Sequence, residues 1–134
     1  MESHTVNLAA RRTLYSIRQP KGSRVMKLLT KEIKQKLENN RSAGWKEARP
    51  IVKFFNPTGK AAWLIGEIEE DGDTMFGLCD LGMGEPALGY VSLRELASVK
   101  LGQGLGIERD LYWTADKTMQ EYADEARQTG YIKA

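Results

Sequence analysis

Three β-rich segments separated by tight turns are the feature that most constrains this chain. They cover residues 51–55, 61–69 and 74–81. The first turn contains Pro57, whose ring fixes φ, and Gly59, which tolerates unusual backbone angles. The second contains Asp71-Gly72, a strong hairpin signal. Because consecutive strands joined by so few residues pair with each other, the sequence predicts an antiparallel meander.

Helices are predicted before and after these strands. Thr30 is a suitable N-cap for a helix that ends near Asn39. Its apolar stripe repeats every four residues and consists of Leu29, Ile33 and Leu37. Ser92 and Glu95 have the spacing of a capping box, which predicts a second helix from Ser92 to about Val99.

A last helix is predicted to begin at Asp116 or Thr118 and to end at Gly130. One face of it would carry Met119, Tyr122, Ala123 and Ala126. Residues 82–89 are interpreted as a flexible glycine-rich loop, and residues 111–113 as a short strand. Together these elements predict an α+β fold, in which two to three α-helices pack on one face of a small antiparallel sheet.

The first 25 residues differ in charge from the rest of the chain. They contain five basic residues and one acid, a net charge of +4, which leaves −2 for the remaining 109 residues. We interpret residues 1–25 as a disordered basic leader or an over-long start that precedes Met26. Residues 26–134 are then expected to form one α+β domain, because a chain of this length supports a single core.

Residue types that carry common chemistries are scarce. The one histidine, His4, lies in the leader, and Cys79 is the one cysteine, so neither a nucleophile–histidine pair nor a usual zinc site is expected in the domain. The chain contains no P-loop. The alternating glycines at 102, 104 and 106 follow a predicted helix, where a dinucleotide fingerprint needs a strand. We therefore expect no cofactor. The chain also has neither an apolar run that could span a membrane nor a signal sequence, so a cytoplasmic protein is expected.

The sharpest candidate site is the charged triplet Glu108-Arg109-Asp110, which follows the glycine-rich segment and precedes the aromatic residues Tyr112 and Trp113. In a strand, Arg109 would point to the face opposite its two acidic neighbours. It would either form an ion-pair clamp on the loop or recognise a partner at a pocket rim. Further candidate binding residues are Tyr112, Glu85 and Tyr90.

A second acidic group lies in and after the middle β-rich segment. It comprises Glu67, Glu69, Asp71 and Asp73, with Glu67 and Glu69 on the same face of the strand by alternation. The spacing is not that of a calcium loop. A solvated hairpin turn and a weak metal or electrostatic site both remain open as interpretations.

From Met26 to about Trp113 the chain resembles the bacterial domain-of-unknown-function family DUF2958, whose members are common on plasmids and other mobile elements. The matching segments include MKLLTKE at residues 26–32, VKFFNP at 52–57, FGL at 76–78 and GIERDLY at 106–112. Trp63 with Glu67, Glu85-Pro86 with the Leu-Gly-Tyr at 88–90, and the segment 92–96 match as well. Ala87 departs from the pattern, which usually has an acidic residue there. The resemblance implies a bacterial protein of a mobile genetic element, but it implies no established activity, substrate or cofactor.

Three functional hypotheses follow. The first is a non-catalytic binding or accessory protein that contacts protein or nucleic acid through a surface formed by residues 82–90 and 104–113. The second is a metal-dependent hydrolase, which requires at least three of the carboxylates of Glu67, Glu85, Glu108 and Asp110 to converge. The third is a DNA-binding accessory protein that uses the basic leader. The oligomeric state is left open.

Overall fold

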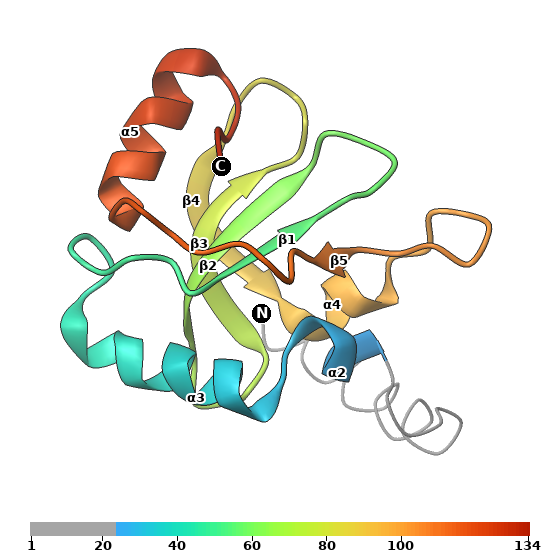
Figure 1. The fold of residues 1–134 in the computed structure, drawn as a ribbon, viewed down its shortest axis with the longest axis horizontal. Helices are drawn as coiled ribbons and strands as arrows, with labels where there is room; N and C mark the ends of the chain where they lie inside the picture. Colours follow the sequence, from blue (N-terminus) through green and yellow to red (C-terminus); the bar gives the residue numbers. More distant parts are fainter. Residues whose placement is uncertain (1–23) are drawn as a thin grey trace, which may run out of the picture.

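A five-stranded antiparallel sheet forms the centre of the protein in the computed structural model, which describes residues 24–134 (Figure 1). The strands are β1 (Val52–Phe55), β2 (Ala62–Ile68), β3 (Thr74–Asp80), β4 (Ala87–Ser92) and β5 (Glu108–Arg109). Their order across the sheet is β4-β3-β2-β1-β5. The predicted meander is confirmed, because β1, β2 and β3 are sequential neighbours paired antiparallel.

A bulge in β2 explains why Gly66 and Gly77 are glycines. The register between β2 and β3 shifts between Ile65 and Glu67, which leaves Gly66 as the extra residue of a bulge. Opposite the bulge, a Cβ on Gly77 would collide with the Leu64 carbonyl oxygen. Only glycine fits there without moving the backbone of β2.

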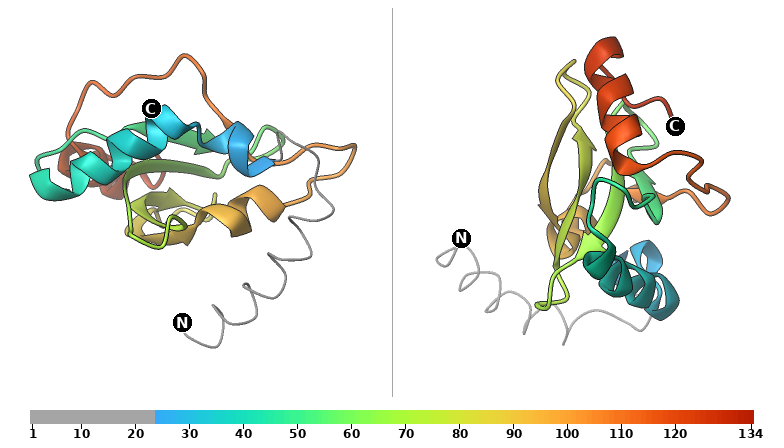
Figure 2. Two further views of the ribbon diagram at one scale, coloured as in Figure 1. Left: turned by 90° about the horizontal axis from the view of Figure 1, so that it is seen from below. Right: turned by 90° about the vertical axis from the view of Figure 1, so that its left-hand side faces the viewer.

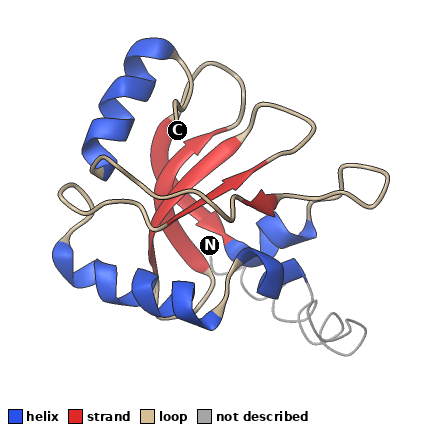
Figure 3. Cartoon of the chain, in the orientation of Figure 1, coloured by secondary structure: helices blue, strands red, loops and turns tan. Residues whose placement is uncertain are grey.

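The helices are α2 (Arg24–Leu28), α3 (Lys31–Asn40), α4 (Leu93–Ser98) and α5 (Met119–Thr129), with a 3-10 turn at Arg41–Ala43 (Figure 3). The predicted caps are present. The Thr30 hydroxyl accepts a hydrogen bond from the Ile33 amide at 3.2 Å, and the Ser92 hydroxyl accepts one from the Glu95 amide at 3.1 Å. At α5, Thr118 is the N-cap of a full capping box, and Gly130 closes the helix with a φ of 85°.

Buried side chains form two clusters, one on each face of the sheet. Neighbouring residues of a strand point to opposite faces. Accordingly, Trp63 and Ile65 belong to the first cluster, together with residues of α2, α3 and α4, while Leu64 belongs to the second, together with α5. The protein therefore has the predicted α+β fold, but its helices are not confined to one face as expected: α2, α3 and α4 pack on one face and α5 on the other. Figures 1 and 2 show α5 near one end of the strands, and α2 and α3 near the other.

Two local predictions need correction. Residues 82–89 are not one flexible loop, because β4 begins at Ala87 and pairs with β3 through Ser92. The strand was hidden by its glycine and by its half-buried character. Residues 111–113 are not a strand either, since the strand is Glu108–Arg109 and the chain turns directly after it.

The described structure begins two residues before the predicted boundary at Met26, since α2 starts at Arg24. The predictions about the leader otherwise fall on residues 1–23, outside the described part of the chain. Within residues 24–134, no helix combines the length and apolar character needed to cross a membrane.

Candidate functional site

The candidate residues lie at two opposite edges of the sheet. Tyr90 belongs to β4 and Glu85 to the loop before it, whereas the triplet 108–110 and Tyr112 lie at and beyond β5. Because β4 and β5 are the two outer strands, residues 82–90 and 104–113 do not form the single surface expected from the sequence. The two edges are separate candidate surfaces.

A cleft of about 500 Å³ lies at the β5 edge, between α2 and the glycine-rich segment. Figure 1 shows α2 and β5 close together there, and the two elements are in contact. Three basic residues and one acid line the cleft, namely Arg24, Lys27, Arg109 and Glu108. Leu28, Leu105, Ile107 and Leu111 supply the apolar part of its lining. The cleft thus combines positive charge with apolar surface.

Arg109 is held by strand pairing and by a helix end. It lies opposite the fully buried Phe54 in β1, while Glu108 lies opposite Phe55, so neighbouring residues of β5 face opposite sides of the sheet; Asp110 lies beyond the strand. The Arg109 guanidinium donates a hydrogen bond of 3.4 Å to the carbonyl oxygen of Leu28, the last residue of α2. A cation at a helix C-terminus is favoured by the helix dipole. Within residues 24–134 no ion pair of Arg109 is found. Its fixed contact there is therefore this hydrogen bond.

The glycine-rich segment holds a second arginine at the cleft. The Arg24 guanidinium donates a hydrogen bond of 2.7 Å to the Gly104 carbonyl oxygen. It lies so close to Gly106 that a Cβ there would be 2.5 Å from the Arg24 Cζ. Gly102 and Gly104 have φ angles of 88° and 77°, which favour glycine and turn the chain. The spacing of these glycines therefore serves a turn and a close approach.

The remaining residues of the triplet differ in role. The amide of Asp110 donates a hydrogen bond of 3.0 Å to the Lys53 carbonyl oxygen of β1, and its carboxylate accepts one of 3.2 Å from the Tyr112 amide. Asp110 therefore ends β5 and turns the chain. Glu108 is exposed at the cleft, and Tyr112 is 94% exposed. The turn leaves the phenol ring facing solvent beside the cleft.

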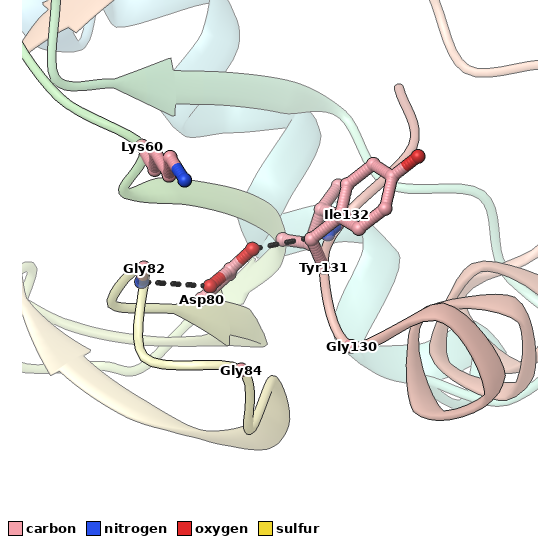
Figure 4. Close-up of a pocket in the computed structure, with 7 residues that line it drawn as sticks. All are labelled: Lys60, Asp80, Gly82, Gly84, Gly130, Tyr131 and Ile132. Atoms are coloured by element: carbon pink, nitrogen blue, oxygen red, sulfur yellow. Dashed lines mark hydrogen bonds between the residues drawn. The ribbon is translucent and has the colours of Figure 1, made fainter.

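A second cleft, of about 520 Å³, lies where the loop after β3 meets the C-terminal segment (Figure 4). Asp80 lies in it with 2% of its surface exposed. Its Oδ1 accepts a hydrogen bond of 2.8 Å from the Gly82 amide, and its Oδ2 accepts one of 3.0 Å from the Ile132 amide. The Asp80 carboxylate thus links the loop after β3 and the C-terminal segment to the end of β3. Asp80 is not among the residues predicted from the sequence, although an acid between the apolar Cys79 and Leu81 was the available signal.

The acidic residues of the β2–β3 hairpin are mostly structural. The Asp71 carboxylate accepts hydrogen bonds of 2.8 Å from the amides of Asp73 and Thr74. Asp73 is buried, and its carboxylate accepts a hydrogen bond of 2.7 Å from the Ser92 hydroxyl and one of 2.9 Å from the Arg94 amide. It therefore fixes the start of α4, which favours the hairpin interpretation over the metal site for Asp71 and Asp73.

The other two acids of this group, Glu67 and Glu69, remain near each other. Partial burial, followed by the neighbouring Glu69 carboxylate, raises the pKa of Glu67. However, nowhere in residues 24–134 do three His, Cys, Asp or Glu side chains come together in a way that could hold a metal ion. The hydrolase hypothesis required such convergence of Glu67, Glu85, Glu108 and Asp110, and this condition is not met.

At the β4 edge, Tyr90 is 67% exposed and packs against Phe76 of β3, with ring centroids 5.1 Å apart. Phe76 in turn contacts Trp45 at 5.6 Å. Glu85 is exposed in the loop before β4. This edge thus carries an aromatic row made by Trp45, Phe76 and Tyr90.

The comparisons with known proteins give one positive result. The model of the DUF2958 family, described as a protein of unknown function, matches residues 28–133. No curated protein and no solved structure matches the chain.

Proposed function

The chain belongs to the DUF2958 family, whose function is unknown, and we propose a function from the site itself. The protein is a non-catalytic binding protein of a bacterial mobile genetic element. It binds an acidic, partly apolar segment of a partner protein in the cleft at the β5 edge. The observation that carries this proposal is the convergence of Arg24, Lys27 and Arg109 around one cleft. The link to a mobile element is supported by the resemblance to a family common on plasmids.

The charges of the cleft favour an acidic ligand. A guanidinium has five N–H donors in a fixed fork that matches a carboxylate. In the described part of the chain, one hydrogen bond of the Arg109 guanidinium is found, to Leu28. The Arg109 guanidinium therefore has N–H donors left for a carboxylate of the partner.

The apolar residues favour a protein over a nucleic acid. Leu111 is 66% exposed and Leu105 is 36% exposed, and both line the cleft beside the exposed Tyr112. Exposed apolar side chains next to an arginine are typical of the centre of protein interfaces. Residues 26–134 carry a net charge of −2, which is unfavourable for a sequence-independent phosphate contact. Nucleic-acid binding by the basic leader is a separate hypothesis that concerns residues outside the described part.

Selection of peptides from a random phage-displayed library by the full-length chain tests the proposal. We expect enriched peptides that carry Asp or Glu next to apolar residues. Arg109→Ala should weaken their binding by about tenfold, as expected for loss of a charged hydrogen-bonded pair. Lys36→Ala, which removes an exposed charge from α3, is the matched control and should bind as the wild type does. Selection of basic peptides, or unchanged binding by Arg109→Ala, would refute the assignment.

A duplex oligonucleotide measured in the same buffer separates protein recognition from nucleic-acid recognition. We expect its binding, if any, to be independent of Arg109 and to disappear as salt is raised. Binding of DNA that is stronger than binding of the selected peptides and is lost in Arg109→Ala would overturn the choice of a protein partner.

A further inference from the structure

The two arginines of the β5 cleft are anchored without losing their charge. The Arg24 guanidinium donates its hydrogen bond of 2.7 Å to the carbonyl oxygen of Gly104. The Arg109 guanidinium donates its hydrogen bond of 3.4 Å to the carbonyl oxygen of Leu28. A backbone carbonyl group is neutral, so it fixes the position of a cation and leaves the positive charge in place, whereas an acidic side chain would cancel it.

The acids around the cleft do not balance this charge. Within residues 24–134, no ion pair involves Arg24, Lys27 or Arg109. The one acid in the lining, Glu108, is exposed and directly precedes Arg109 in β5, where neighbouring residues face opposite sides of the sheet. Three positive charges against one negative charge leave the lining with a formal net charge of +2.

The size of this charge distinguishes a phosphate group from a carboxylate as the ligand. A carboxylate carries a single negative charge and would leave half of the excess uncompensated. A phosphorylated serine or threonine carries a charge of about −1.5 to −2 at pH 7 and has three acceptor oxygens. It would neutralise the lining almost completely, and its oxygens can accept hydrogen bonds from several cations at once. Clusters of arginines are a common means by which proteins recognise phosphorylated segments.

We propose that the acidic residue bound in this cleft is a phosphorylated serine or threonine of the partner protein. The inference rests on the proposed function, because it specifies the ligand of the same cleft. Arg24, Lys27 and Arg109 bind the phosphate oxygens. Leu105 and Leu111 contact apolar residues beside the phosphorylated one. This apolar lining favours a protein segment over a nucleic-acid backbone, in which each phosphate is flanked by further phosphates.

Three peptide libraries test the inference, each with random flanking positions and with phosphoserine, glutamate or serine fixed at the centre. The full-length chain, immobilised on beads, should retain the phosphoserine library most strongly, the glutamate library less and the serine library least. Retention of the glutamate library at least as strong as that of the phosphoserine library would refute the phosphate site and leave the proposed function standing. Retention of neither would refute both.

One retained peptide, synthesised with either phosphoserine or glutamate at its centre, then gives dissociation constants by fluorescence anisotropy. We expect the phosphorylated form to bind about tenfold more tightly. Lys27→Ala removes one positive charge and leaves both arginine anchors in place, so this ratio should fall to about threefold. Lys36→Ala, exposed on α3, is the matched control and should leave the ratio unchanged. An unchanged ratio in Lys27→Ala would refute joint binding by the three cations.

Inorganic phosphate and a duplex oligonucleotide, added as competitors of the phosphopeptide, distinguish the source of the phosphate group. We expect each to displace the labelled peptide only at a much higher concentration than the unlabelled phosphopeptide does, because neither makes its apolar contacts. Displacement by inorganic phosphate or by the duplex at a concentration equal to or below that of the phosphopeptide would overturn the choice of a protein segment. Circular dichroism of each variant verifies that the fold is retained.

Discussion

The two glycines that face each other in β3 and β4 allow a sharp test of the sheet geometry. Gly77 and Gly89 are cross-strand partners, and neither has a positive φ. Replacing either by alanine reduces the freedom of the unfolded chain, a gain of about 0.5–1 kcal/mol where the new Cβ fits. At Gly89 it fits, because nothing lies within 4 Å. At Gly77 it does not.

A Cβ on Gly77 would collide with the Leu64 carbonyl oxygen and lie 2.9 Å from the Ile65 Cα. Both are backbone atoms of β2 next to the bulge, so no side chain can rotate away. Overpacking of this kind costs about 1–3 kcal/mol, and more where the backbone has to move. We therefore expect Gly77→Ala to lower the free energy of unfolding by about 2 kcal/mol and Gly89→Ala to raise it by about 0.5 kcal/mol.

Urea unfolding followed by tryptophan fluorescence measures the difference, with all three proteins at one concentration. For a slope of about 2 kcal/mol/M, the midpoints of the two variants should differ by about 1 M. Both variants make the same chemical change in paired positions, so each is the control for the other. Midpoints that agree within about 0.3 M would refute the reasoning, because the Leu64 carbonyl oxygen would then not lie over Gly77.

Three further predictions concern Asp73, Cys79 and the capping box of α5, which Thr118 and Glu121 form. Asp73→Ala should lower the free energy of unfolding by about 2 kcal/mol, since it leaves the Ser92 hydroxyl and the Arg94 amide without their acceptor, and Asp73→Asn should recover part of the loss in the same urea assay. Burial raises the pKa of the Cys79 thiol from 9.0 to about 11. Its reaction with a thiol reagent at pH 8 should therefore be about a hundredfold slower in the folded than in the unfolded protein. The stability that the buried, protonated thiol contributes should be lost as the pH rises through about 11. Thr118→Ala should cost about 1 kcal/mol by removing the cap of α5. Hydrogen bonds from Thr118 lower the pKa of Glu121 below 4.5. The stability that the capping box contributes should therefore be lost as the pH falls through that lower pKa. In a plot of the free energy of unfolding against pH, Glu121→Gln should make the decline at acid pH less steep.

Sequence reasoning predicted those parts of the fold that depend on local chemistry. Thr30, Ser92 and Thr118 carry their capping function in three neighbouring residues, and the structure confirms all three caps. The meander was equally local, because its turns contain Pro57 and Asp71-Gly72. By contrast, the half-buried β4 has neither an alternating pattern nor an apolar run, and it is a strand because β3 pairs with it. Tertiary pairing of this kind is invisible in a short window of sequence.

The candidate sites show the same limit. The sequence singled out Arg109 and proposed an ion-pair clamp, whereas its contact in the described residues is a hydrogen bond to the Leu28 carbonyl oxygen, 81 residues away in the chain. Likewise, Asp73 reads as a turn residue in sequence. In the fold it is buried because it serves the start of α4, 21 residues beyond it at the Arg94 amide. A carboxylate that caps a distant helix cannot be told from a solvated one until the pairing of strands is known.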